Sequence, residues 1–356
     1  MHGSAGGSVG AERRGGVGEY SSSDPGCSRA VQVQPRRPSP HSQAEAQGHE
    51  LARYDASLRQ RGSLTVWFTD EAIQAWLAEP RTTRGGQPWY SRLAILTALT
   101  LRAVFRLALR QTEGLIGSII RLLGLDLAVP DHTTLSRRAA TLEVPRPPSG
   151  STDAVSQAEP MQLLVDSTGL KLCGPGEWLV EKHGTKTRRS WRKLHLGVDA
   201  DTGQIVAPAL TGREAGDGAQ VGPMLDQVAG PVASVTGDGA YDQDSVYASV
   251  AQRHPEAAII VPPSSTAVPS KMAEREPTQR DCHVQVIAAH GRMAWQKASG
   301  YNRRARAETA VGRWKRVIGD GLRSHTDERR TTEVEVAVQV LNRMLELGRP
   351  TYVRIA

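Results

Sequence analysis

Residues 161–166 read Met-Gln-Leu-Leu-Val-Asp, a short apolar run that ends on the carboxylate of Asp166. Residues 232–236, Val-Ala-Ser-Val-Thr, form a second such run shortly before Asp238. Short apolar runs of this kind predict buried β-strands. A carboxylate at the end of a strand is held on a rigid element and can point into a crevice at the edge of the sheet. A single Asp in such a place is more often a turn residue or a helix cap. The two Asp residues therefore indicate a metal site only if a third acid joins them.

The segments around these two runs predict an α/β fold. Residues 199–203, Asp-Ala-Asp-Thr-Gly, form a hairpin turn between two further strands. Three strands, a helix, a strand, a helix, a strand and final helices together predict a mixed sheet flanked by helices. Residues 264–290 show no clear pattern. The expected strands are 161–166, 191–198, 204–210, 232–236 and 258–261, and the expected helices are 219–228, 244–253, 302–318 and 333–347.

The chain upstream of the sheet is predicted to be helical. Apolar residues recur there at three- and four-residue steps, which is typical of amphipathic helices. The last two helices, 112–123 and 132–142, resemble a helix-turn-helix, and Arg137 and Arg138 on the second are candidate DNA contacts. An ordinary helical hairpin fits the same pattern equally well. The other expected helices are 70–77 and 91–110.

Shifts in composition divide the chain into four parts. Residues 1–48 are rich in Gly, Ser, Pro, Gln and Arg and have almost no large apolar side chains, so we expect a disordered tail. Residues 49–144 form the predicted helical, DNA-binding domain. Residues 145–158 contain several Pro, Gly and Ser residues and are predicted to be a linker. Residues 159–350 form the predicted α/β catalytic domain.

Positive charge is concentrated in two segments. The 356-residue chain has a net charge of +7. Residues 182–193 hold six Lys and Arg and no acid, and residues 301–330 hold nine against four acids. Basic patches of this kind suit a polyanionic partner. A solvated charged face gives the same pattern in a single run.

The third acidic residue lies in the second basic segment. Tyr301, Arg304, Glu308 and Lys315 are spaced at 0, 3, 7 and 14 residues. At about 100° per residue these positions fall within roughly 60° of each other on a helix. Glu308 could then bind a metal while Arg304 and Lys315 meet phosphates. The simpler alternative is a surface ion pair between Arg304 and Glu308, four residues apart.

These segments resemble one protein family when they are taken together. The spacing Tyr301-x2-Arg304-x3-Glu308-x6-Lys315 is similar to the Tyr-Arg-Glu-Lys signature of DDE transposases from bacterial insertion sequences. Val-Asp-Ser-Thr-Gly-Leu-Lys around Asp166 resembles the first acidic motif, and Gly-Asp-Gly-Ala-Tyr-Asp at 237–242 the second. The segments at 54–64 and 130–138 resemble the N-terminal helical region of the insertion sequence 5 family.

The resemblance implies an RNase H-like catalytic domain that acts on DNA. Asp166, Asp238 and Glu308 would be the catalytic residues and would hold two Mg²⁺ or Mn²⁺ ions. Such an enzyme binds the terminal inverted repeats of its element, cleaves the strands there and joins them to target DNA. Double-stranded DNA is the implied partner, and a homo-oligomer is expected because two ends must be brought together.

The resemblance also implies DNA contacts outside the acids. The basic run at 182–193 would follow the DNA backbone, through Arg188, Arg189, Arg192 and Lys193 among others, with salt-sensitive affinity. The signature residues Tyr301, Arg304 and Lys315 would contact the DNA near the metals, and Arg137 and Arg138 would read the inverted repeats. Trp191, in the basic run, is expected in the core rather than stacked on a base.

Two other functions are compatible with parts of the pattern. A metal-dependent nuclease without strand joining would keep the three acids. A DNA-binding regulator with an inactive transposase-derived domain would have no need of them. The chain has neither an apolar run of 18 residues nor the apolar core of a signal peptide. We therefore expect a cytoplasmic protein that associates with the nucleoid when bound to DNA, and no membrane partner.

Overall fold

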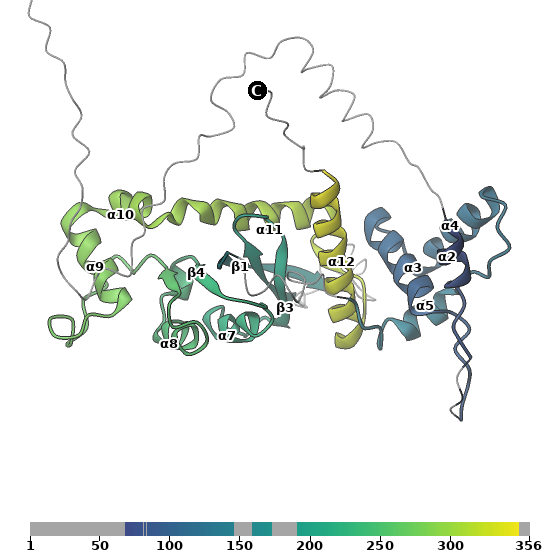
Figure 1. The fold of residues 1–356 in the computed structure, drawn as a ribbon, viewed down its shortest axis with the longest axis horizontal. Coiled ribbons are helices and arrows are strands. Elements are labelled where there is room, and N and C mark those ends of the chain that lie inside the picture. Colours follow the sequence, from purple (N-terminus) through teal and green to yellow (C-terminus); the bar gives the residue numbers. More distant parts are fainter. Residues whose placement is uncertain (1–67, 81, 83, 146–158, 173–190, 349–356) are drawn as a thin grey trace, which may run out of the picture.

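The computed structural model describes residues 68–348, except 81, 83, 146–158 and 173–190 (Figure 1). The predicted tail at 1–48, most of the predicted linker, and Arg188 and Arg189 therefore lie outside the described residues. Within them, the helices that precede the sheet lie at one end of the molecule, and a pair of helices that follows the sheet lies at the other (Figure 1). No helix in this part of the chain is long and apolar enough to cross a membrane.

A mixed sheet forms the centre of the molecule, as predicted. The strand order is β3-β2-β1-β4-β5, and β6 also pairs with β1. The pairs β1–β2 and β2–β3 are antiparallel, whereas β4 pairs in parallel with β1 and β5. The strands are β1 (Met161–Leu172), β2 (Trp191–Asp199), β3 (Ile205–Gly212), β4 (Val232–Thr236), β5 (Ala258–Ile260) and β6 (Gly321–Leu322).

Strand β1 is longer than predicted, and Asp166 lies in its middle. The expectation that the strand ends at Asp166 was wrong. Asp166 pairs with Leu196 of β2, and the ladder continues to Lys171 opposite Trp191. The strand continues through polar residues because β2 pairs with it along this stretch, and β6 pairs with its last two residues. Asp166 is therefore held by the ladder with β2, whereas the pairing with β4 ends at Leu164.

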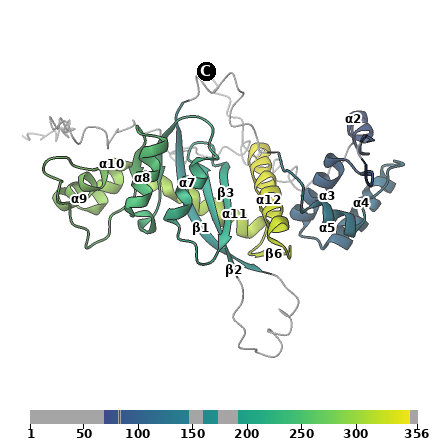
Figure 2. The ribbon, with the colours of Figure 1, turned by 90° about the horizontal axis from the view of Figure 1, so that it is seen from below.

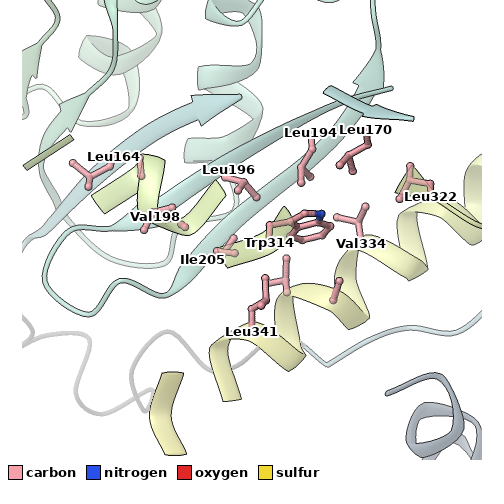
Figure 3. Close-up of a cluster of buried hydrophobic side chains, with 14 of the residues drawn as sticks. Leu164, Leu170, Leu194, Leu196, Val198, Ile205, Trp314, Leu322, Val334 and Leu341 are labelled. Atoms are coloured by element: carbon pink, nitrogen blue, oxygen red, sulfur yellow. The ribbon is translucent and has the colours of Figure 1, made fainter. Parts of the chain in front are cut away.

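Helices cover both faces of the sheet (Figure 2). On one face pack α7 (Val221–Leu225) and α8 (Asp244–Arg253), with a cluster that includes Met224, Tyr241 and Val250. On the other pack α11 (Ala305–Val317) and α12 (Asp327–Leu347). Trp314 of α11 is 1% exposed and lies between the sheet side chains and those of α12 (Figure 3). Packing on both faces is the arrangement that a largely buried central strand requires.

The helix predicted at 91–110 is interrupted. The structure has α3 (Arg92–Phe105) and α4 (Leu109–Leu122), with Arg106 between them in the left-handed conformation at φ 52°. The Nε of Arg106 donates to the carbonyl of Val317 at 2.7 Å, so a distant part of the chain holds the break. Ser91 caps α3, and Thr69 caps the short α2 (Asp70–Gln74).

The helices before the sheet share a core with α12. Trp76, Ile95, Ile116 and Leu135 are buried there together with Val336 and Val340 of α12. Helix α5 (His132–Arg138) is capped by Asp131 and joined to α4 through residues 123–131. This connector is longer than the three- or four-residue turn usual in a helix-turn-helix. A DNA-reading role for α4 and α5 stays a prediction.

Two helices that the sequence left unassigned follow β5. These are α9 (Gln279–His290) and α10 (Arg292–Ser299). Thr278 and Asp281 form a capping box at the start of α9. The indole of Trp295 donates to Nδ1 of His283 at 2.9 Å, which ties the two helices together in a buried contact. They lead directly into the segment that carries Arg304 and Glu308.

Candidate active site

Asp166 is presented by the middle of β1. Its Oδ1 accepts the backbone N–H of Ser167 at 2.9 Å, and its side chain is 15% exposed. Burial raises the pKa of Asp166, and the nearby carboxylates of Asp238 and Glu308 add to the rise, while the Ser167 N–H and Arg304 oppose it. Burial and neighbouring carboxylates destabilise the ionised form of Asp166, and a bound cation would stabilise it.

Asp238 follows β4 and begins a single 3₁₀ turn, η2 (Gly239–Tyr241). Its Oδ1 accepts the backbone N–H of Ala240 at 2.9 Å. Gly237 lies just before it, and a Cβ there would come within 2.7 Å of the ring of Tyr241. Glycine at 237 therefore allows the chain to turn tightly over the buried Tyr241, just after Thr236 of β4, which pairs with Leu164 of β1.

Arg304 and Glu308 come from the junction of a 3₁₀ turn with α11. The predicted helix 302–318 begins as η3 (Tyr301–Arg304) and becomes α-helical at Ala305. Residues three apart superpose in a 3₁₀ turn, and residues four apart are neighbours in an α-helix. Arg304 and Glu308 therefore stay on one side, as predicted. The ring of Tyr301 packs against Trp295, with ring centroids 5.5 Å apart.

The three acids converge on the guanidinium of Arg304. Its Nη2 lies 3.9 Å from Oδ1 of Asp166 and 3.6 Å from Oδ2 of Asp238. Its Nη1 donates to Oε1 of Glu308 at 2.6 Å. The predicted surface ion pair between Arg304 and Glu308 is thus present, but the same arginine also faces the two aspartates. Elements far apart in the sequence bring three carboxylates around one positive charge.

This group of oxygens fits hard divalent cations. Mg²⁺ and Mn²⁺ prefer carboxylate oxygens, and the three acids supply such oxygens. Among the described residues, no three acidic, His or Cys side chains are already closed into a set of metal ligands. In this structure Arg304 supplies the positive charge that the carboxylates share, which keeps them within reach of one centre despite their repulsion.

The predicted DNA-contacting residues are only partly brought to this site. Lys315 is exposed on α11, about 10 Å along the helix from Glu308 at 1.5 Å per residue. Arg192 pairs with Asp327 at 2.8 Å. The Nζ of Lys193 donates to the carbonyl of Ala215 at 2.9 Å and lies 3.3 Å from Asp217.

The two arginines of α5 lie far from the acids in the fold. They belong to the helices before the sheet (Figure 1). Arg137 is exposed, and its Nη2 lies 3.4 Å from Oγ1 of Thr134. Arg138 donates from Nη1 to the carbonyl of Tyr90 at 3.0 Å, which ties α5 to the start of α3. Arg137 therefore offers the freer guanidinium for a DNA contact.

Trp191 is not in the core, so that expectation was wrong. Its side chain is 37% exposed at the start of β2. The ring covers Gly169, where an added Cβ would come within 3.2 Å of it, and the Nζ of Lys171 lies 6.0 Å from its centroid. Trp191 is the first residue of β2, so its ring lies at the end of the ladder with β1.

A buried polar cluster beside β1 was not predicted from the sequence. His195 of β2 is 0% exposed and pairs in the strand register with Ser167, the neighbour of Asp166. Its Nε2 lies 2.9 Å from Oγ1 of Thr211, and its Nδ1 lies 3.5 Å from Oδ1 of Asp217. The sequence shows Lys193 and His195 on one face of the strand. Their common partner, Asp217, follows more than twenty residues later, so the cluster could not be read from the strand alone.

His195 predicts an acid-sensitive fold. Burial lowers its pKa from 6.5 to about 4, with Lys193 adding to the fall and Asp217 opposing it. Because the unfolded chain takes up this proton below pH 6.5 and the folded one does not, stability is complete above pH 6.5 and is lost as pH falls toward 4. We expect His195 to account for about 2–3 kcal/mol of the loss between pH 7 and 4.5.

Urea unfolding at the two pH values measures this contribution. His195→Gln, which keeps a polar side chain next to Thr211, should lose less stability between pH 7 and 4.5 than the wild type. His325→Gln removes an exposed histidine and serves as the control. Equal pH dependence in the wild type and His195→Gln would contradict the assignment.

The fold and the site together define a class of enzyme. A mixed sheet with helices on both faces and three converging carboxylates fits a metal-dependent enzyme that cleaves phosphodiester bonds.

Comparison with protein families identifies the member of that class. A family model described as "Transposase DDE domain" matches residues 157–345, more than half of the chain. A second model with the same description matches residues 59–175. The chain belongs to the DDE transposases, and it is a metal-dependent enzyme acting on DNA.

Proposed function

We propose that the protein is the transposase of a bacterial insertion sequence of the insertion sequence 5 type. It binds the terminal inverted repeats of its element, cleaves DNA at their boundary and transfers the freed ends to target DNA. Asp166, Asp238 and Glu308 are its catalytic residues and hold two Mg²⁺ or Mn²⁺ ions. The observation that carries this proposal is the approach of all three carboxylates to the single guanidinium of Arg304.

The three acids have distinct surroundings that suit this role. Asp166 is fixed within β1 and is the least exposed of the three, whereas the side chains of Asp238 and Glu308 are 38% and 59% exposed. Asp166 can therefore hold a deep ligand position while the other two reach toward DNA. Bound divalent ions supply an activated oxygen nucleophile and stabilise the leaving oxygen. The protein itself orients the ligands and excludes water from one side.

Arg304 is placed to exchange one partner for another. With a metal held by the carboxylates, the planar guanidinium of Arg304 would be able to receive the phosphate next to the cleaved bond through two parallel hydrogen bonds. Tyr301 holds the turn in place by packing on Trp295, and Lys315 extends the positive charge along α11. These residues bind and orient DNA, and none of them needs to form a covalent bond to it.

Cleavage of a defined DNA duplex tests this function. A linear duplex carrying the element's own terminal repeat should be cut at the repeat boundary in Mg²⁺, leaving a 3′-hydroxyl, and the product should join to a plasmid target. A duplex of the same length with a scrambled repeat is the control. Ends with a dideoxy terminus should be bound but not joined, because the 3′-hydroxyl is the attacking group.

The other outcomes separate the remaining functions. Cutting at the boundary without joining, in the presence of target DNA, would indicate a nuclease rather than a transposase. Specific binding without any cutting, in both Mg²⁺ and Mn²⁺, would indicate the regulator with an inactive domain. Equal binding and cutting of the scrambled duplex would remove the assignment to terminal repeats. If the wild type does prefer the repeat, an unchanged preference in Arg137→Ala would remove Arg137 as a reader of the repeat.

A further inference from the structure

A small cavity lies where the helices before the sheet meet the catalytic part of the chain. Its volume is about 40 Å³, and it is lined by α3, the segment 318–324 and the first half of α12. Four of the lining residues are arginines and one is acidic. The arginines are Arg102, Arg106, Arg323 and Arg329, and the acid is Glu333.

Glu333 is the single acidic residue that lines the cavity, beside four arginines. Its Oε1 accepts the backbone N–H of Arg323 at 3.0 Å, and its Oε2 accepts the backbone N–H of Ser324 at 2.8 Å. Each oxygen therefore accepts one N–H of the turn before α12, and the single negative charge is set against four positive charges. Among the ion pairs of the described residues, none involves any of the four arginines.

Two of the arginines are anchored by backbone carbonyls. Arg106 donates from Nε to Val317 at 2.7 Å and from Nη2 to the carbonyl of Arg316, so it caps the end of α11. Arg323 donates from Nη1 to the carbonyl of Arg106. These contacts fix the two guanidinium groups in place, yet each uses only part of the five N–H donors of an arginine.

The other two arginines have buried donors without a partner. The Nε of Arg102 and the Nε of Arg329 are both buried and make no hydrogen bond in the described structure. Burial lowers the pKa of Arg102, and the charge of Arg323 lowers it further, while Glu333 opposes the fall. Buried charges and donors without partners are costly, and they are normally paired or bound to a ligand.

The size of the cavity restricts what can satisfy these donors. A water needs roughly 10–15 Å³ of such space, so about 40 Å³ holds a few waters or one tetrahedral oxyanion. Guanidinium groups match phosphate oxygens through paired hydrogen bonds. Arg106 and Arg323 are exposed, so the cavity is open to an anion that belongs to a larger molecule.

The position of the cavity suits a DNA phosphate in particular. It lies next to the end of α11, about 14 Å along that helix from Glu308 at 1.5 Å per residue, with Lys315 between them. A duplex that lies along α11 with one phosphate at the acids would bring further phosphates of the same backbone past Lys315 to the cavity.

We propose that this arginine cavity binds a backbone phosphate of the DNA and thereby ties the helices before the sheet to the catalytic domain. This inference rests on the proposed action on DNA and adds a binding site outside the three acids. Arg102 and Arg106 come from the first region, and Arg323 and Arg329 come from the second. One phosphate held by all four would fix the two regions relative to the duplex.

The salt dependence of DNA binding tests the proposal. Fluorescence anisotropy of a terminal-repeat duplex with the full chain, in EDTA and at a series of KCl concentrations, gives the slope of log affinity against log salt. Each phosphate contact contributes about 0.9 to this slope. Arg329→Gln and Arg102→Gln should each reduce it by up to about 0.9, and the two changes together by no more than that, because they share one phosphate. Arg343→Gln, an exposed arginine on the same helix paired with Glu346, is the matched control and should leave it unchanged.

A second measurement separates a phosphate site from a structural role. Sodium phosphate, compared with sodium chloride at equal ionic strength, should raise the unfolding temperature of the wild type and not that of Arg102→Gln. If Arg329→Gln fails to fold, Arg329→Lys keeps the charge without the planar fork, and it should lose the stabilisation by phosphate while keeping most of the salt slope.

The outcomes also distinguish this proposal from the proposed function. Equal slopes in the wild type, Arg329→Gln and Arg343→Gln would overturn the DNA-phosphate site, even if the wild type cuts the terminal-repeat duplex in Mg²⁺. Stabilisation by free phosphate with equal slopes would overturn it in favour of a small-anion site. Because binding is measured in EDTA, a loss of slope in Arg329→Gln would support the site even if cleavage failed.

Discussion

Asp166→Asn is expected to reduce Mg²⁺-dependent cleavage of terminal-repeat DNA by at least about a thousandfold. The amide keeps the shape and the hydrogen bond from Ser167 but removes the charge of the least exposed metal ligand. DNA affinity in EDTA should stay within about twofold of the wild type, because DNA does not need this charge. Single-turnover cleavage and anisotropy measure the two effects, and calorimetric titration with Mn²⁺ measures the lost metal affinity.

The control for this change is Asp226→Asn. Asp226 is an exposed carboxylate paired with Arg253 on the opposite face of the sheet, so its loss should leave cleavage intact. Because burial raises the pKa of Asp166, the neutral variant should unfold at the same temperature as the wild type or a higher one when no metal is added. Cleavage by Asp166→Asn within tenfold of the wild type would exclude Asp166 as a ligand.

Trp314→Ala is expected to lower the free energy of unfolding by about 3–5 kcal/mol. Trp314 is 1% exposed and fills the space between β2, the end of β1 and α12 (Figure 3). Its removal leaves a cavity among leucines that are themselves fixed in the sheet, so the surroundings can close in only partly. Urea unfolding followed by circular dichroism measures the loss.

Trp89→Ala separates this packing effect from the loss of a tryptophan as such. Trp89 is 65% exposed, and its replacement should change the free energy of unfolding by less than about 0.5 kcal/mol. A small effect of Trp314→Ala on the free energy of unfolding would mean that the core of the sheet does not depend on packing against α11. The same helix carries Glu308, so a large effect would also reduce cleavage at temperatures near unfolding.

Local sequence patterns correctly predicted the strands and helices that are defined by residues close together in the chain. Residues 232–236 and 244–253 have the predicted bounds, since a short apolar run or a regular helical repeat defines each of them. The turn at 199–203 also joins two antiparallel strands as expected. The mixed sheet followed from the order of these elements. The three acids were singled out from their contexts, and the contact between Arg304 and Glu308 from their four-residue spacing.

Features that depend on distant partners were missed. The continuation of β1 past Asp166 depends on β2 and β6, and the break at Arg106 depends on carbonyls of α11. The placement of Arg304 between Asp166 and Asp238 joins segments more than sixty residues apart. Helices α9 and α10 lack a strong apolar repeat because their buried contact is a polar one, between His283 and Trp295.

Helix α12 completes two cores at once, one with the sheet and one with the helices before it. It is also the last described element to leave the ribosome. At synthesis rates of about 5–20 residues per second, roughly ten to forty seconds pass between residue 142 and residue 340. During that time the apolar side chains around Ile95 and Leu135 lack their packing partners Val336 and Val340. The core of the helices before the sheet is therefore completed only when α12 has been made, so the two parts of the enzyme complete their folding together.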